Sequence, residues 1–468
     1  MASFFNSDTR HGYVKRFIYM RHCETFIATT QQASRKYQTI IYDAFAGAGC
    51  YCADSPVGIE NYGSPLIALY VVIRFFIRKN NLKYTPQRPV DIREFKGPIQ
   101  HIKRDIQMPE SEKDVILNFS EANKGNCLKL VNNIFIILNA YGVGGTIFSN
   151  SDGVLTIESD NPDFPFCINV ARTKFTHVKP PNDKSNRRLL TFIDPFGYSQ
   201  IPMQHVQEFI GEGREALINF MSSYVNRFKK LKNNEAAISN LFGFSDEEKR
   251  ERLAELRFGS DENDGIDRCL QMYEKELKKR AGSGFILTFA VLDKRNIRHY
   301  HLTFITNHRK GFIAMKEAMN RGSQDADSLS MSDYKVEKNG MLLSLGNDQN
   351  NKVVAAMIFE RFQGQEEVKI SDIEDFILDK TPFVWRKRPL KILQKEPEDR
   401  PRLTTVADKN GNRPKKYTFP DGTEWRLTFR TQSVNERCLQ LLRVLTLKSH
   451  ARARARVMRM ETSVLIYR

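Results

Sequence analysis

Two acids and two glycines in the first part of the chain form the first candidate for chemistry. Residues 39–45 are mostly β-branched and aromatic, which predicts a buried strand that contains Asp43 near its end. Gly47 and Gly49 follow and predict a tight turn whose backbone carries no side chains. A later predicted strand ends just before Glu121. Acids and a bare turn at strand ends can hold a hydroxylated ligand, and a plain turn with two surface acids is the alternative.

The segment Ile193-Asp194-Pro195-Phe196-Gly197 makes this pattern more specific. Together with segments 63–69 and 300–308, the two motifs resemble the three-Cys-motif partner proteins, and the resemblance covers most of residues 38–430. That family is similar in fold to class I S-adenosylmethionine-dependent methyltransferases. The resemblance implies an α/β fold, a doubly wound Rossmann-like methyltransferase sheet with a C-terminal winged helix-turn-helix domain.

The resemblance also implies a cofactor, S-adenosyl-L-methionine. In such a protein Gly47 and Gly49 let the methionine and adenosyl portions lie against the end of the first strand. Glu121 is expected to accept hydrogen bonds from the ribose hydroxyls. Asp43 is expected to orient the turn or to meet the ammonium group of the methionine portion, and Phe45 belongs to the same cofactor-binding turn.

The Asp194 segment is the predicted place of methyl transfer to an amino group. That reaction needs an acceptor for the protons of the amine, a rigid loop and an aromatic face that holds a base. We expect Asp194 to be the acceptor and Phe196 or Tyr198 to be the stacking surface. Enzymes that methylate the adenine amino group typically read Asp or Asn, Pro, Pro, aromatic, whereas Phe196 and Gly197 stand in the last two positions here. A strand-terminal Asp-Pro turn in an inactive relative is therefore the alternative.

The composition describes a folded and basic protein. Its 468 residues are 41% hydrophobic and carry a formal net charge of +17, which favours nucleic acid or an anionic membrane surface as a partner. The seven cysteines are scattered and odd in number, as is typical of reduced intracellular thiols. The apolar run 66–77 is too short to span a bilayer. We expect a soluble protein of the cytoplasm or nucleus that does not enter a membrane.

Alternating strand and helix patterns predict several segments along the chain. One strand near an edge of the sheet is expected to be antiparallel, because 285–292 and 299–305 read as adjacent strands. The expected segments are a lead helix at 1–37, a methyltransferase-like domain at 38–330 with a helical insertion at about 226–280, a winged helix-turn-helix domain at 331–430, and a basic tail at 431–468.

The C-terminal part predicts a nucleic-acid-binding module. Segments 353–362, 370–378 and 385–394 read as three helices, and a hairpin is expected around Asp421-Gly422. The third helix is strongly basic and is the expected recognition helix, although a charged helix is also commonly a solvated face. Its candidate contacts to nucleic acid are Arg386, Lys387, Arg388, Lys391 and Lys395.

Together these patterns predict a methyltransferase that acts on nucleic acid. A similarity of the first motif to ribosomal RNA adenine methyltransferases favours RNA slightly over DNA. The main alternative is a catalytically silent scaffold of the same fold that binds nucleic acid or a protein partner. Methylation of a protein or of a small molecule is a third possibility.

Overall fold

The computed structural model describes a large part of the chain, in two compact units formed by Met1–Ala326 and Asp327–Arg468. The sequence placed this boundary at residue 330. The predicted tail lies outside the described residues apart from residue 431, as do residues 1–9. The described residues are 10–33, 37–51, 58–83, 86–87, 94–182, 185–258, 262–282, 284–292, 298–325, 337–338, 341–342, 347–381, 383–395, 402–408, 411–412, 419 and 425–431.

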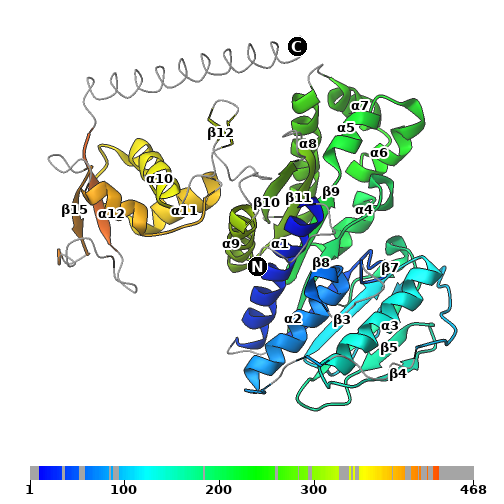
Figure 1. Cartoon of the computed structure of the whole chain (residues 1–468). Helices are drawn as coiled ribbons and strands as arrows, with labels where there is room; N and C mark the ends of the chain where they lie inside the picture. Colours follow the sequence, from blue (N-terminus) through cyan, green and yellow to red (C-terminus); the bar gives the residue numbers. More distant parts are fainter. Residues whose placement is uncertain are drawn as a thin grey trace, which may run out of the picture. The chain divides into compact units, whose positions relative to one another are not determined.

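The first unit is an α/β structure around one large mixed sheet (Figure 1). In chain order its strands are β1 (Gln38–Asp43), β3 (Val115–Ser120), β4 (Thr146–Ser149), β5 (Leu155–Glu158), β6 (Phe166–Ala171), β8 (Arg187–Ile193), β9 (Arg214–Phe220), β10 (Phe285–Leu292) and β11 (Arg298–Thr306). They lie side by side in the order β10-β11-β9-β8-β1-β3-β6-β5-β4. A separate parallel pair joins β2 (Ile106–Gln107) to β7 (Val178–Lys179).

The middle of the sheet contains a reversal of strand order. Strands β6, β3, β1, β8 and β9 are parallel to their neighbours in this group. From β1 the chain proceeds through β3 to β6 on one side, and then returns to form β8 and β9 on the other. In open α/β sheets, ligands bind beyond the carboxyl ends of the strands at such a reversal. The predicted site residues follow these same strands.

Antiparallel strands flank the parallel group on both sides. Strand β11 is antiparallel to β9 and β10, as the sequence predicted. The prediction of a single antiparallel strand was incomplete, because β5 is antiparallel to both β6 and β4. The physical reason is the short connection from residue 159 to 165, since a parallel crossover needs a dozen or more residues.

Helices cover both faces of this sheet (Figure 1). One face carries α1 (Arg10–Gln31), α2 (Ser64–Lys79), α3 (Lys124–Ala140) and α9 (Arg309–Asp325), with α1 packed between α2 and α9. The other face carries α4 (Met203–Val206), α5 (Ser222–Phe228), α6 (Glu235–Phe242), α7 (Lys249–Arg257) and α8 (Glu262–Ala281). Helices α5 to α8 are the predicted insertion, and Gly243 ends α6 with φ of 66°.

The described residues of the second unit form three helices and a small antiparallel sheet around an apolar core of their own. The helices are α10 (Asn347–Phe362), α11 (Ile370–Lys380) and α12 (Arg388–Lys395). The sheet has the order β14 (Val368–Lys369), β16 (Arg426–Phe429) and β15 (Leu403–Ala407). Another antiparallel pair joins β12 (Glu337–Lys338) to β13 (Met341–Leu342).

The predicted third helix of this unit was too long at its beginning. Helix α12 begins at Arg388, so Arg386 and Lys387 precede it. Pro389 lies in its first turn, where a missing N–H is tolerated and the preceding residues are disfavoured as helix. The predicted turn at Asp421-Gly422 lies outside the described residues, and β16 pairs in the described part with β14 and β15.

Within the part of the chain that the structure describes, no helix has both the length and the apolarity needed to cross a membrane.

Candidate functional site

The two glycines of the turn after β1 have different surroundings. Both have positive φ, 61° for Gly47 and 77° for Gly49, a conformation that favours glycine. A Cβ atom on Gly49 would lie 2.7 Å from Leu130 Cδ1 and 3.2 Å from Leu66 Cγ. A Cβ atom on Gly47 would have no atom within 4 Å. Gly49 therefore lets α2 and α3 pack against the turn, and Gly47 leaves its backbone open.

Asp43 ends β1 with a fully buried carboxyl group. Its Oδ1 accepts a hydrogen bond from the N–H of Phe45 at 3.1 Å, so it orients the turn, which is one of the two predicted roles. Its Oδ2 has no hydrogen-bond partner among the described residues. Burial raises the pKa of Asp43 to about 7, against smaller lowering effects of the Ser64 hydroxyl and the Phe45 N–H. A buried oxygen of this kind needs a hydrogen-bond donor or a cation.

Glu121 connects the end of β3 to the glycine-rich turn. Its Oε2 accepts the N–H of Gly47 at 2.9 Å, and its Oε1 accepts the N–H of Asn123 at 2.6 Å. Asn123 in turn caps α3 through the N–H of Asn126. The Glu121 carboxylate is thus held in one orientation, while each oxygen retains a lone pair for a ligand hydroxyl.

A cavity of about 300 Å³ lies beside Glu121 at the carboxyl edge. Two predicted aromatic residues, Phe45 and Phe196, line it. Thr173 and Phe175, which follow β6, also line it, and the ring centroids of Phe45 and Phe175 are 5.7 Å apart. Neither residue was predicted from the sequence. The sequence contained a weak clue to them, because a polar and an aromatic residue follow β6, the third strand of the parallel group in chain order.

Asp194 lies at the end of β8 and is engaged on both oxygens. Its Oδ2 accepts a hydrogen bond from Lys15 Nζ at 2.5 Å, and its Oδ1 accepts one from Asn219 Nδ2 at 2.7 Å. The side chain of Asp194 remains 20% exposed. Burial by itself lowers the pKa of Lys15, but the Asp194 carboxylate and the Tyr300 hydroxyl raise it, so its net pKa lies above the ordinary value. Lys15 and Asn219 therefore hold the Asp194 carboxylate from two sides.

Neither Lys15 nor Asn219 was found from the sequence. Lys15 is on α1 and is separated from Asp194 by 179 positions, so no local pattern joins them. Asn219 is at the end of β9 and had a weak signal, because it is a polar residue at the close of a buried strand. Its Oδ1 has no hydrogen-bond partner among the described residues.

The two predicted stacking residues differ in their exposure. Phe196 is 76% exposed at the rim of the cavity. Its N–H and that of Gly197 both donate to Gln200 Oε1, so the loop that carries the ring is held in place. Tyr198 is partly buried against the core, and burial raises its pKa. The structure therefore brings Phe196 to the cavity and does not bring Tyr198 there.

Three of the predicted basic residues occupy one exposed face of α12 in the second unit. Arg388, Lys391 and Lys395 are exposed on α12, while Leu390 and Leu393 of the same helix are buried. Before the helix, Arg386 is exposed, and Lys387 Nζ donates to the carbonyl of Phe419 at 2.5 Å.

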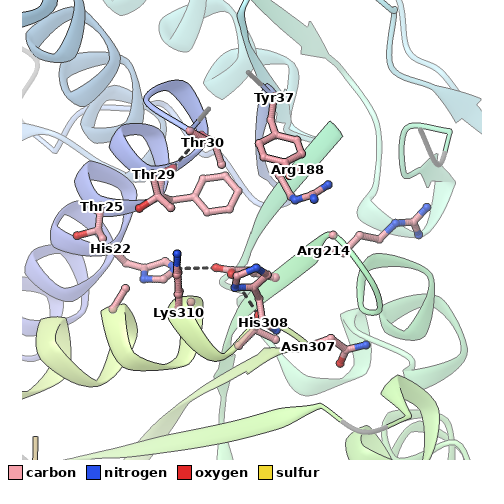
Figure 2. A pocket seen from close by; sticks show the side chains of 17 residues that line it. His22, Thr25, Thr29, Thr30, Tyr37, Arg188, Arg214, Asn307, His308 and Lys310 are labelled. Carbon is pink, nitrogen blue, oxygen red and sulfur yellow. Dashed lines mark hydrogen bonds and ion pairs between the residues drawn. The ribbon is translucent and has the colours of Figure 1, made fainter. Parts of the chain in front are cut away.

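A second cavity, of about 210 Å³, lies at the opposite edge of the large sheet. Figure 2 shows His22 and three threonines of α1 on one side of it, with His308 and Lys310 at the start of α9 on another. The pair at its floor is buried, with His22 Nε2 2.9 Å from Glu215 Oε2. Thr306 Oγ1 donates to Glu215 Oε1 at 3.1 Å. Both carboxylate oxygens are therefore satisfied within the protein.

Metal-ligating side chains do not gather anywhere in the described ranges, which contain no group of three or more His, Cys, Asp or Glu residues able to hold an ion.

Comparison with known proteins gives no family assignment. No family model matches the sequence, and no curated protein matches it. Among solved structures, the crystal structure of protein LPL1258 from Legionella pneumophila str. Philadelphia 1, of the family DUF519, is similar with a TM-score of 0.33 and 12% identity. The similarity covers 68% of this chain and 95% of that chain.

Proposed function

We propose that the protein is an S-adenosylmethionine-dependent methyltransferase that acts on nucleic acid. One observation carries the proposal: a cavity at the reversal of strand order is bordered by an acid, Glu121, that is fixed to the open turn at Gly47. This arrangement suits a ligand that has a hydroxylated sugar beside an aromatic base.

The architecture of both units supports the proposal. Five parallel strands with a reversal between β1 and β8, and helices on both faces, are features of a doubly wound Rossmann-like sheet. In the second unit, three helices and an antiparallel strand pair suit a winged helix-turn-helix domain. We therefore keep membership of the three-Cys-motif partner family as part of the proposal.

The residues of the carboxyl edge fit the proposed cofactor. The unpartnered Oδ2 of Asp43 suits the ammonium group of the methionine portion. Gly47 leaves room for a ligand against its backbone, and Glu121 can accept the ribose hydroxyls. Phe45 and Phe175 offer apolar surface to the adenine ring. When bound, S-adenosylmethionine supplies an electrophilic methyl group.

The chain itself positions the methyl acceptor. Asn219 and Lys15 hold the Asp194 carboxylate in a single orientation. Asp194 can then accept a hydrogen bond from the amino group of a substrate, which orients the nitrogen lone pair. The exposed ring of Phe196 offers a face on which an extruded base can stack. Catalysis in this scheme is chiefly positioning.

The second unit is proposed to hold the nucleic acid. Arg388, Lys391 and Lys395 form an exposed basic surface along α12, as in a recognition helix that contacts phosphates and base edges. RNA remains the favoured substrate over DNA. Binding through such contacts weakens steeply as salt rises.

A silent scaffold is the second candidate, and a specific observation favours it. Both oxygens of Asp194 already accept hydrogen bonds, one of them from the ammonium group of Lys15, which competes with a substrate amine for the same acceptor. In this alternative the sheet is retained, the chemistry is lost, and the basic surface recruits nucleic acid or a protein partner.

Calorimetry with S-adenosylmethionine and S-adenosylhomocysteine separates the two candidates. We expect binding of both ligands to the full-length protein. The matched variants are Gly47→Asn, because Asn tolerates positive φ while its side chain fills the open space, and Glu158→Ala, a change of acid on β5 away from the cavity. Gly47→Asn should abolish binding, and Glu158→Ala should not. Absence of binding to the unmodified protein would leave only the scaffold.

Transfer of label from the cofactor to total cellular RNA, DNA and protein then identifies the substrate. We expect label in RNA. Label in protein alone would contradict a nucleic-acid substrate while leaving the methyltransferase proposal intact.

A further inference from the structure

Exposed apolar side chains in the first unit concentrate on one side of the sheet. The described residues contain six large hydrophobic side chains that are exposed. Five of them lie in segments that leave the carboxyl ends of β1, β8 and β9, namely Tyr51, Phe196, Tyr224, Leu231 and Phe258. The sixth, Phe148, is on β4, far from α5 and α7 (Figure 1). Single exposed rings are ordinary, but a concentration of them marks an interaction surface.

Three of these five side chains are aromatic rings covered on one side by an arginine. The guanidinium carbon lies within cation–π distance of the ring centroid in each pair. The pairs are Arg16 with Tyr51 at 4.6 Å, Arg227 with Tyr224 at 5.7 Å, and Arg268 with Phe258 at 5.4 Å. Tyr51 and Phe258 are nevertheless 62% and 72% exposed, so much of each ring faces solvent.

The helical insertion brings the pairs on α5 and α8 together. Arg257, the last residue of α7, donates from Nε to the carbonyl of Lys229 at 2.7 Å. Phe258 follows directly and therefore lies beside the end of α5. Helix α8 packs closely on α5, because a Cβ atom on Gly265 would lie 2.3 Å from Asn226 Oδ1.

Charge accompanies the rings on this surface. Lys230 and Lys232 are exposed immediately after α5, next to the exposed Leu231. Because β9 ends at Phe220 and α5 begins at Ser222, this surface continues from the edge that carries the candidate site. Aromatic rings can stack on bases, and nearby cations can contact phosphates. This combination suits a single strand of nucleic acid, whose bases are unpaired.

We propose that this surface, the aromatic platform defined by Tyr224 and Phe258, binds single-stranded nucleic acid by base stacking. The inference rests on the proposed nucleic-acid substrate and deepens it, because it specifies an unpaired strand at the first unit. Arg227 and Arg268 extend the platform through their planar guanidinium groups. A duplex has its bases stacked internally and cannot use these rings.

Fluorescence anisotropy with labelled single strands tests the platform in the full-length protein. The probes are a uridine 15-mer, a thymidine 15-mer and a 15-base-pair duplex. Phe258→Ala should weaken binding of both single strands about tenfold, because removing a ring on which one base stacks typically costs an affinity loss of that size. The affinity for the duplex should be unchanged. Phe148→Ala is the matched control, because its ring is exposed on β4 and lies outside the platform. It should change neither affinity.

Equal affinities of Phe258→Ala and Phe148→Ala for single strands would overturn the inference. A loss for both single strands and duplex would also overturn it, because stacking would then not be the mode of contact. Stronger binding to the uridine strand than to the thymidine strand would identify RNA as the nucleic acid that the platform prefers. Thermal melting of Phe258→Ala checks that the fold is kept, and we expect no change because the ring is exposed.

Calorimetry on the same preparations separates this inference from the proposed function. If the protein binds the cofactor and Phe258→Ala has an unchanged affinity for single strands, the platform is contradicted and the methyltransferase proposal is not. Specific loss of strand affinity in a protein that binds no cofactor would remove the methyltransferase proposal and retain the platform.

Discussion

Each of the two edges of the large sheet places a carboxylate against α1, but the two carboxylates differ in their burial and in their hydrogen-bond partners. At the amino edge, Glu215 is buried and accepts hydrogen bonds from His22 and Thr306. At the carboxyl edge, Asp194 is partly exposed and is held by Lys15 and Asn219. His22 and Lys15 are seven positions apart on α1, which places them on one face of the helix.

The difference teaches that a cavity alone does not mark a functional site. Glu215 lines the cavity at the amino edge, but both of its carboxylate oxygens already accept hydrogen bonds within the protein. The carboxyl edge instead keeps an unpartnered Asp43 Oδ2, an open turn at Gly47 and an exposed Phe196. The first arrangement stabilises α1 on the sheet, and the second leaves an open backbone at Gly47 and an exposed ring at Phe196 that a ligand can contact.

The largest effect that sharpens this contrast is a pH dependence caused by Asp43. Its folded pKa of about 7 lies above the ordinary value of 3.8, because the carboxyl group is buried. Between these values the unfolded state releases the proton and the folded state keeps it, so stability falls as pH rises from about 4 to about 7. The asparagine of Asp43→Asn does not titrate, so the unfolding free energy of this variant minus that of the unmodified protein should increase by on the order of 4 kcal/mol over this range.

Urea denaturation at several pH values measures that difference. A constant difference from pH 4 to 7 would mean that Asp43 is not desolvated in solution. Saturating cofactor should reduce the slope if its ammonium group meets Asp43.

At the amino edge, Glu215→Ala should lower the unfolding free energy by about 3 kcal/mol. The change leaves His22 and Thr306 buried without their acceptor, and breaking a buried pair from one side is costly. Cofactor affinity should be unchanged. Denaturation and calorimetry on the same sample check both statements, and a loss of cofactor affinity in a folded variant would contradict the division between the two edges.

At the carboxyl edge, Asp194→Asn should keep cofactor binding and lower methyl transfer about 100-fold. Asparagine retains the shape of the side chain but presents an amide N–H where the substrate amine needs an acceptor. The change should also lower the unfolding free energy, because the Lys15 side chain is only 14% exposed and loses its carboxylate partner. Single-turnover transfer of labelled methyl groups measures the effect, and unchanged transfer would remove Asp194 from the reaction.

The smallest effect concerns a second buried lysine, Lys229, which in the described part of the chain lacks a carboxylate partner of the kind that Lys15 has in Asp194. Lys229 is buried on the helical insertion, and its Nζ has no hydrogen-bond partner among the described residues. Burial lowers the pKa of Lys229, whereas the Asp194 carboxylate raises that of Lys15. Lys229→Met should therefore raise the unfolding free energy by about 1 kcal/mol at neutral pH. The gain should shrink as pH rises toward 10.5, and denaturation across that range would show a pH-independent gain if the charge were irrelevant.

Much of the sheet was predictable because its signals are local. Apolar β-branched runs identified β1, β3, β8, β9, β10 and β11. The first four are parallel strands buried on both faces, which read as continuous hydrophobic segments. The turn at Gly47 and Gly49 was found for the same reason. The start of α12 was misplaced, because Arg386 and Lys387 have helical composition but precede the first turn that contains Pro389.

The sequence by itself determined which residue types end the central strands: an acid on β1 and after β3, and Asp194 after β8. Only the tertiary structure decided what each of them does. It divided the two glycines into one that packs and one that is open, placed Lys15 of α1 on Asp194, and brought Phe175 rather than Tyr198 to the cavity. The physical reason is that strand formation follows from neighbours along the chain, whereas hydrogen-bond partners and burial depend on helices and loops that are distant in sequence.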